Sequence, residues 1–241
     1  MTAAFDGERV KALVFDVFGT VVDWRGSIIT AGAALTRDWG LALDWDRFAD
    51  AWRATYGPSM NRVRRGEIGW QNLDSLHRTS LEEVLGEFGV RGLREAQKEQ
   101  LTRLWHRLHG WPDATPGLTR LKARFIIAPC SNGNVALIVN MAKHAGLPWD
   151  CVLGAELAHA YKPDRIVYET AAGLLGLPCE QVLMVAAHGG DLRAAAAAGL
   201  RTAYIPRPLE HGPEHAATFV PERGFDIAAN DLTDLAARLG A

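Results

Sequence analysis

Six polar side chains that could carry out hydrolysis follow four short apolar runs, far apart in the chain. A carboxylate close to an ammonium group stays ionised and can attack an electrophile as a nucleophile. A hydroxyl and an amide beside that pair could hold an anionic substrate. We therefore interpret the first carboxylate as the nucleophile of a hydrolase, and not only as a strand-end cap of the following turn. In chain order the six residues are Asp16, Thr20, Ser131, Asn132, Lys162 and Asp191.

These side chains can act together only if the fold brings them to one place. The apolar run from Val10 to Phe15 is typical of a strand buried on both faces. After Pro112, short strands alternate with helices, which predicts βαβ units and a parallel sheet whose strands all end at one edge. The expected fold class is α/β, with a Rossmann-like parallel-sheet core. Further strands are expected near 124–128, 152–153, 181–186 and 202–205, and helices at 117–122, from 134, at 164–175, at 192–198 and from 230.

A long helical stretch separates the first strand from the others. Its apolar residues recur at helical spacing in four blocks, which are divided by Asp44, Gly66, Gly89 and Gly110. We predict an α/β core domain at 1–22 and 111–241 and an inserted helical cap domain at 23–110. Because ligands bind outside the carboxyl ends of strands in such sheets, this cap would cover the site as a lid. The four helical blocks are 27–39, 45–65, 70–88 and 93–108.

The composition argues against a nucleic-acid or membrane partner, a disulfide framework and a zinc site. The chain has 241 residues, a net charge of −2 and a pI of about 6.4, so no nucleic-acid or membrane partner is expected. The densest basic run, Arg62-Val-Arg64-Arg65, is interpreted as a solvated helix face. Three cysteines without paired spacing predict neither a disulfide framework nor a zinc site. With no apolar membrane span and no signal peptide visible, a cytoplasmic location is expected.

The motifs around these side chains resemble those of the haloacid dehalogenase superfamily. The resemblance rests on four motifs in order and covers nearly the whole chain. It implies the α/β core and helical cap expected above, and it supports Asp16 as the nucleophile. The motifs are Phe15-Asp16-Val17-Phe18-Gly19-Thr20, Cys130-Ser131-Asn132, Tyr161-Lys162-Pro163 and Asp191.

Two positions depart from the Mg²⁺-dependent phosphatases of that superfamily. The phosphatases carry a general-acid aspartate two residues after the nucleophile, where this chain has Phe18. They usually carry an aspartate four residues before the last motif carboxylate, where this chain has Ala187. Mg²⁺ prefers several oxygen ligands in octahedral geometry, so the remaining Asp16 and Asp191 would hold it poorly. The sequence therefore predicts no metal and no cofactor.

The combination resembles the L-2-haloacid dehalogenase family, whose chemistry explains both losses. A halide leaves as a weak base and needs no general acid, and the substrate has no phosphoryl group to clamp. The resemblance implies an (S)-2-haloacid dehalogenase that attacks C2 of a short haloacid, forms an aspartyl ester and hydrolyses it with water. The expected substrates extend to fluoroacetate. A homodimer is expected only by analogy with relatives. The alternatives are a Mg²⁺-dependent phosphatase of the same fold, an enzyme that opens another electrophile such as a strained ring, and a non-catalytic carboxylate-binding protein.

The resemblance also suggests roles for the catalytic side chains. Thr20 would hold the nucleophile by a hydrogen bond, unless it is an ordinary turn threonine. Lys162 would lie against Asp16 and keep it ionised, unless it is a surface lysine before a proline. Asp191 would orient Lys162 or the hydrolytic water, and an N-cap of the following helix is compatible with that role.

Five further residues are expected to bind the substrate. Ser131 and Asn132 would hold its carboxylate and help to bind the departing halide. Tyr168 is either a site residue or a core tyrosine. Arg25 is the candidate for the cap arginine that binds the substrate carboxylate, with a hinge salt bridge to Asp23 as its alternative.

His188 replaces a residue of the family's fourth motif and could bind halide or activate water, although a lone histidine is more often structural. Beside it, Gly190 stands where relatives have a bulky aromatic residue, which predicts a wider or wetter pocket. Trp24 and Tyr56 could form walls of the pocket or simply pack inside the cap.

Overall fold

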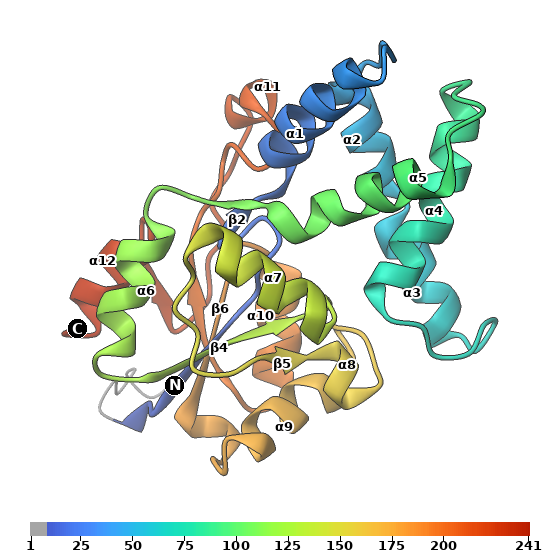
Figure 1. Cartoon of the computed structure of the whole chain (residues 1–241). Helices are drawn as coiled ribbons and strands as arrows, with labels where there is room; N and C mark the ends of the chain where they lie inside the picture. The colour runs from blue at the N-terminus through green and yellow to red at the C-terminus, as the bar shows by residue number, and fades with distance from the viewer. Residues whose placement is uncertain (1–8) are drawn as a thin grey trace.

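The computed structural model describes residues 9–241 and contains a six-stranded sheet whose strands all run parallel. Figure 1 shows this sheet below a group of helices formed by the first half of the chain. The predicted α/β class and parallel sheet are confirmed. In spatial order the strands are β5 (Leu153–Gly154), β4 (Ile126–Ser131), β1 (Ala12–Phe15), β6 (Val182–Ala186), β7 (Arg201–Tyr204) and β8 (Ile227–Ala228).

The central position of β1 puts its carboxyl end next to those of β4 and β6. Phe15 pairs with Pro129 on one side and with Val185 on the other. Since parallel strands end at the same edge, the residues that follow Phe15, Pro129 and Val185 become neighbours in space. The register therefore brings three of the four predicted motifs together.

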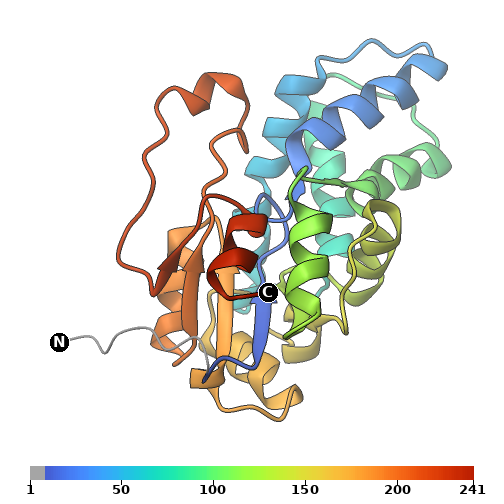
Figure 2. The same cartoon turned by 90° about the vertical axis from the view of Figure 1, so that its left-hand side faces the viewer.

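Helices cover both faces of the sheet, as Figure 2 shows from the side. Alternate residues of β1 point to opposite faces: Leu13 and Phe15 belong to one buried cluster and Val14 to another. This burial on both faces explains the continuous apolar runs of the strands. The first face is covered by α6 (Ala114–Lys122), α7 (Val135–Ala145) and α12 (Leu232–Arg238), and the second by α9 (Arg165–Leu174) and α10 (Gly189–Ala197).

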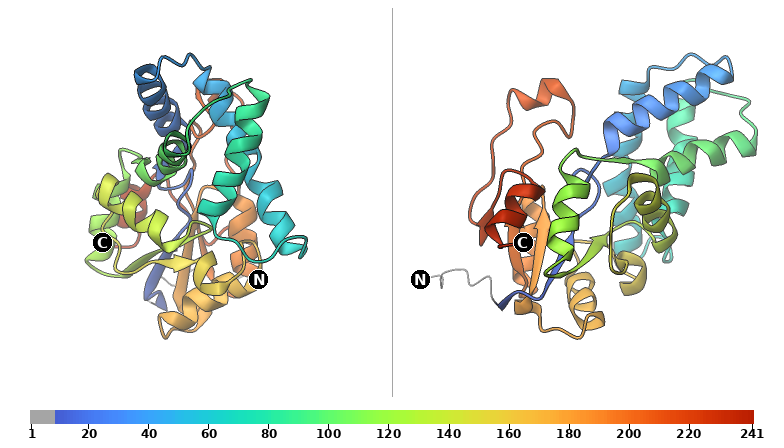
Figure 3. Two further views of the ribbon diagram at one scale, coloured as in Figure 1. Left: turned by 45° about the vertical axis from the view of Figure 1, so that its right-hand side comes forward. Right: turned by 60° about the vertical axis from the view of Figure 1, so that its left-hand side comes forward.

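The insertion after β1 is helical, as predicted, and Figure 3 shows it projecting from the sheet. Side chains of Asp23, Asp44 and Asn72 accept hydrogen bonds from backbone N–H groups and so cap three of its helices. Its elements are α1 (Trp24–Asp38), α2 (Trp45–Ala54), α3 (Tyr56–Arg64), α4 (Leu73–Glu87), α5 (Glu95–Thr102) and the 3₁₀ helix η2 (Arg103–Arg107).

The helix expected over 45–65 is interrupted. Its first part, α2, ends at Ala54, and the side-chain hydroxyl of the C-cap residue Thr55 donates to the carbonyl oxygen of Trp52. Pro58 lies in the first turn of α3, where a missing N–H costs nothing, so the helix restarts there. The start of α3 lies near the carboxyl ends of the strands.

A short antiparallel pair of strands closes the insertion. β2 (Val22–Asp23) pairs with β3 (His109–Gly110), with Val22 opposite Gly110. The predicted boundaries at 22/23 and 110/111 fall at this pair, and the division into two domains stays a prediction. Three more short helices are α8 (Ala155–Ala158), η3 (Cys179–Gln181) and α11 (Pro213–Ala216). Among residues 9–241, no helix combines the length and the apolar character that a membrane crossing needs.

Candidate active site

Asp16 lies at the carboxyl end of β1 and is almost fully buried, with 7% of its surface exposed. Its Oδ1 accepts a hydrogen bond from Lys162 Nζ at 2.9 Å. Its Oδ2 accepts from Thr20 Oγ1 at 2.8 Å and lies 2.9 Å from His188 Nδ1. Burial alone would raise the pKa of Asp16, but Lys162 and His188 hold it well below its usual range. The carboxylate is therefore ionised and fixed in orientation.

The ammonium of Lys162 lies between two carboxylates. Besides Asp16, it pairs with Oδ2 of Asp191, and its side chain is only 6% exposed. Burial alone would lower the pKa of Lys162, but Asp16 and Asp191 raise it well above its ordinary value. Burial raises the pKa of Asp191, with a further increase from Asp16 opposed by Lys162. Lys162 therefore places a positive charge beside Asp16. On the other side of Lys162, Asp191 is a carboxylate that can accept a proton.

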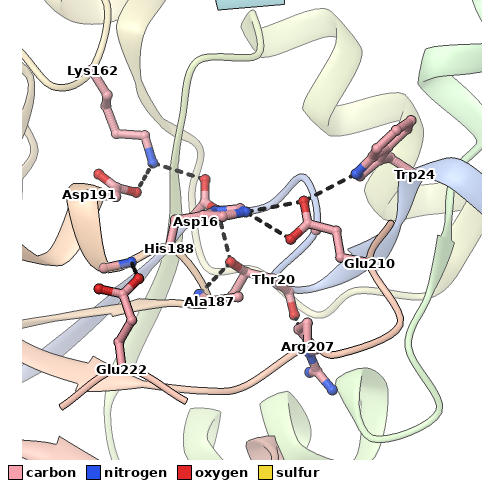
Figure 4. A network of polar contacts seen from close by, with 12 residues as sticks. Asp16, Thr20, Trp24, Lys162, Ala187, His188, Asp191, Arg207, Glu210 and Glu222 are labelled. Carbon is pink, nitrogen blue, oxygen red and sulfur yellow. Dashed lines mark hydrogen bonds and ion pairs between the residues drawn. The ribbon is translucent and has the colours of Figure 1, made fainter. Parts of the chain in front are cut away.

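His188 bridges Asp16 to a residue that the sequence did not indicate, Glu210 (Figure 4). Its Nε2 lies 2.9 Å from Glu210 Oε2, and its side chain is about a third exposed (36%). Burial alone would lower the pKa of His188, but hydrogen bonds and charges of Asp16 and Glu210 raise it to about 10. At neutral pH both ring nitrogens are therefore protonated, and each donates to a carboxylate.

The loop after Asp16 is fixed by contacts to other loops. Thr20 Oγ1 donates to Asp16 and accepts from the backbone N–H of Ala187 at 2.9 Å. Arg207 Nε donates to the backbone oxygen of Thr20, and its two terminal nitrogens each bond the carboxylate of Asp113 at 2.7 Å. The hydrogen bond predicted from Thr20 to Asp16 is present, and Thr20 also connects the nucleophile to the loop after β6.

Of the two predicted site residues at the end of β4, Asn132 lines the cavity and Ser131 lies behind it. Asn132 accepts a hydrogen bond from the backbone N–H of Lys162 at 2.8 Å and so fixes that residue. Ser131 is fully buried, and its Oγ accepts from the backbone N–H of Gly133. Tyr168 is also fully buried and donates to Oδ1 of Asp191. Ser131 and Tyr168 therefore lie next to the cavity without forming its wall.

A cavity of about 400 Å³ opens over Asp16, between the strand ends and helices α2 and α3. A Cβ atom added to Gly190 would meet no other atom within 4 Å, so the space beside this residue is open. Tyr56 lines the cavity, whereas Trp24 instead donates its indole N–H to Glu210. The walls are formed by Asp16, Phe18, Arg53, Tyr56, Gly57, Met60, Asn132, Lys162, Pro163, His188, Gly190 and Asp191.

The predicted position of Arg25 is wrong. Its guanidinium makes two hydrogen bonds to Asp50, at 2.7 and 2.9 Å, and a salt bridge to Asp46. Arg25 lies in the first turn of α1, and its side chain binds these two aspartates of α2. It therefore neither lines the cavity nor forms the hinge salt bridge to Asp23. The arginine in the cavity wall is Arg53, in the last turn of α2.

Arg53 was missed because no sequence pattern distinguishes it from the other arginines of the insertion. Helical periodicity shows which residues share a face but not which face meets the sheet edge. Glu210 was missed for a different reason: it lies in an irregular segment after β7, with no motif around it. The interpretation of Asp191 as an N-cap is also wrong, because α10 begins at Gly189 with His188 at the N-cap and Asp191 inside the first turn.

The side chains around Asp16 do not offer the oxygen ligands that a magnesium ion requires. Both of its oxygens already receive protein donors, and the ammonium of Lys162 occupies the place between Asp16 and Asp191. Ala187 offers no side-chain oxygen, and Mg²⁺ requires several such ligands. Within the described part of the chain, no group of three or more His, Cys, Asp or Glu side chains is placed to hold a metal ion.

Three comparisons agree on the relationship of this chain. A family model described as haloacid dehalogenase-like hydrolase matches residues 10–199. The structure is similar to that of the L-2-haloacid dehalogenase PA0810, at 49% identity and a TM-score of 0.92 over 96% of this chain and 99% of that one. It is also similar to that of the defluorinating L-2-haloacid dehalogenase Rha0230, at 46% identity and a TM-score of 0.93 over 99% and 100%.

Among curated proteins, (S)-2-haloacid dehalogenase 4A of Burkholderia cepacia is 28% identical over an alignment of 218 residues that covers 83% of this chain and 84% of that protein. The residues matched by the family model include Asp16, Lys162 and Asp191. The chain therefore belongs to the haloacid dehalogenase-like hydrolases and, within them, to the L-2-haloacid dehalogenase family.

Proposed function

We propose that this protein hydrolyses short 2-haloalkanoic acids to 2-hydroxy acids and halide, through an ester formed on Asp16. The observation that carries the proposal is an ionised, buried carboxylate at the floor of a small cavity, next to Lys162. The names of its relatives support the same class of reaction, since PA0810 and the Burkholderia protein are described as haloacid dehalogenases. Fluoroacetate belongs in the substrate panel because Rha0230 is described as defluorinating.

Phe18, two residues after the nucleophile, suits a leaving group that needs no proton. Phe18 lies where a phosphatase has its general acid, and its ring packs edge-on against Tyr56 and Trp105. A hydrocarbon ring can neither donate nor accept a proton. A halide leaves without protonation, whereas an alcohol released from a phosphate ester would require it.

The cavity also has a group that suits the substrate carboxylate. Arg53 lies in its wall, and the Nε of Arg53 is buried without a hydrogen-bond partner. A guanidinium binds a carboxylate through two parallel hydrogen bonds, which would satisfy such a donor. We assign to Arg53 the role that the sequence had suggested for Arg25.

The reaction proceeds in two steps. An oxygen of Asp16 attacks C2, the carbon–halogen bond breaks, and the halide leaves with the bonding electrons as C2 inverts. Water then attacks Cγ of the ester and gives a proton to the carboxylate of Asp191. Asp191 returns this proton to the ester oxygen as the bond between Cγ and that oxygen breaks, so the hydroxy acid leaves with a hydroxyl group. The hydroxyl that water left on Cγ loses its proton to solvent, and Asp16 is again a carboxylate. One proton is released in total.

Ion chromatography of halide release tests the proposal. Fluoro-, chloro- and bromoacetate and both enantiomers of 2-chloropropionate form the panel, each with and without EDTA. We expect halide and one equivalent of hydroxy acid, no effect of EDTA, and no turnover by freshly prepared Asp16→Asn. Full activity of that variant would refute the proposed nucleophile.

The same panel separates the alternatives. Strong Mg²⁺-dependent release from p-nitrophenyl phosphate would favour the phosphatase, which Phe18 and the donor set around Asp16 disfavour. Tight carboxylate binding without any turnover would favour a binding protein. The homodimer and the cytoplasmic location stay predictions.

A further inference from the structure

The two oxygens of Asp16 have different surroundings. Oδ1 receives one hydrogen bond, from Lys162, whereas Oδ2 lies within hydrogen-bond distance of two donors, Thr20 Oγ1 and His188 Nδ1. An oxygen that already has two donors is the poorer nucleophile. Oδ1 therefore suits the attack on C2, and Oδ2 then remains as the carbonyl oxygen of the ester.

The second step places negative charge on that carbonyl oxygen. When water adds to Cγ, the electrons of the carbonyl bond move to Oδ2 until the ester bond breaks. Thr20 and His188 lie 2.8 and 2.9 Å from Oδ2, which is the distance expected for donors that stabilise an oxyanion. A charged donor stabilises such an oxygen more than a neutral one.

Glu210 determines whether His188 keeps its charge during this step. In the resting enzyme two carboxylates hold the imidazolium, but esterification removes the negative charge of Asp16. Glu210 then remains as the directly bonded carboxylate of His188, at 2.9 and 3.1 Å from Nε2. Glu210 is itself held: its side chain is 6% exposed, and Oε1 accepts a hydrogen bond from the indole of Trp24.

We propose that Glu210 is a positioning residue for hydrolysis of the Asp16 ester, acting through His188, which donates to Oδ2 as that oxygen becomes negative. The proposal rests on the proposed function above and assigns a role in its second step only. Bonds and protons follow the scheme already given: His188 donates a hydrogen bond throughout and transfers no proton. The proton of water still passes to Asp191.

The other charged groups near His188 are more distant or differently engaged. Lys162 and Asp191 lie beyond Asp16 and are paired with each other. Glu222 accepts from the backbone N–H of Gly189 and pairs with Arg193. His211 lies on the far side of Glu210, at 3.9 Å. None of them replaces Glu210 as a hydrogen-bonded partner of Nε2.

The test separates the two steps by rapid-quench measurement of chloride from 2-chloropropionate, with intact-mass detection of the esterified enzyme. The variant is Glu210→Gln, and the control is Glu214→Gln, which removes an exposed carboxylate from the same segment. We expect Glu210→Gln to release the first equivalent of chloride as fast as the wild type and then to accumulate ester. At pH 9 the steady-state rate of Glu210→Gln should be at least about 10-fold below that of the wild type, because a neutral His188 is a weaker hydrogen-bond donor than a charged one.

The pH profile distinguishes this role from a structural one. Without Glu210, burial lowers the pKa of His188 in the ester, so protonation returns only as the pH falls. The steady-state rate of Glu210→Gln relative to the wild type should therefore rise progressively between pH 9 and pH 5. The control should match the wild type throughout. An equal loss at all pH values, or a loss of the chloride burst, would refute the role of Glu210. Absence of chloride release from the wild type would instead refute the proposed function.

Two further variants test the proposal if the Glu210→Gln protein does not fold. Glu210→Asp keeps the charge and should retain most of the steady-state rate at pH 9. His188→Asn keeps a neutral donor, so its hydrolysis step should be slow and should not change between pH 6 and pH 9. A pH dependence in His188→Asn like the one expected for Glu210→Gln would also refute the proposal.

Discussion

The guanidinium of Arg53 lies over the ring of Tyr56, with its Cζ 4.0 Å from the ring centre, in the wall of the cavity above Asp16. Cation–π contact holds the planar group at a fixed angle, and the second aromatic neighbour is Trp24, at 5.5 Å. An arginine held in this way is oriented before substrate arrives, so little side-chain entropy is lost on binding.

Replacement of Arg53 by alanine should weaken substrate binding far more than replacement of Arg25. Loss of a charge-assisted hydrogen-bond pair costs about 1.5–3 kcal/mol, so KM for 2-chloropropionate should rise roughly 10- to 100-fold. Arg53→Lys should recover only part of this, because an ammonium cannot form the bidentate pair. In Arg25→Ala, KM should change by less than about threefold. Similar effects in Arg25→Ala and Arg53→Ala would contradict the assignment of Arg53.

His188 should contribute a pH-dependent part of the stability. Its pKa is raised from 6.5 to about 10 by Asp16 and Glu210, which outweigh burial. A raised pKa stabilises the fold fully below the unfolded value and loses this contribution as pH rises through the folded value. The Tm of the wild type should therefore exceed that of His188→Asn most at pH 6 to 6.5, and the difference should decrease toward pH 10. A difference that grows with pH would contradict the protonated state assigned to His188.

Phe18 should matter for packing and not for proton transfer. It is 3% exposed and packs against Tyr56 and Trp105. Phe18→Ala should lower the free energy of unfolding by about 3–5 kcal/mol, measured by urea denaturation. Phe18→Leu fills most of the space, so it should lose less and should still release halide. A fully stable Phe18→Ala protein would show that this contact does not support the cavity wall.

The sequence predicted the sheet and the residues at its strand ends because both follow from local patterns. Apolar runs closed by polar residues mark buried strands, and parallel strands necessarily gather their ends, so Asp16 and Lys162 could be placed together. Arg53 and Glu210 lack such a signal. The position of Arg53 depends on how a helix rotates against the sheet, and that of Glu210 on the path of an irregular segment after β7. Both are set by tertiary packing, which no short window of sequence encodes.

Gly19 lets us test the position of Glu210 through the backbone. Its φ is +82°, which disfavours residues other than glycine, and an added Cβ would lie 2.1 Å from Glu210 Oε1. Gly19→Ala should therefore strain the loop and also push Glu210 away from His188. Steady-state turnover should then fall at pH 9 more than at pH 6, as expected for Glu210→Gln.

Gly40 provides the matched control, because its φ is +68° but an added Cβ would meet nothing within 4 Å. Both alanine variants should lose about 1 kcal/mol of stability to the left-handed backbone. Only Gly19→Ala should change the pH profile of turnover, since only its methyl group reaches the carboxylate. A wild-type profile in Gly19→Ala would mean that Glu210 can move without affecting the reaction, and that its contact with His188 has no part in ester hydrolysis.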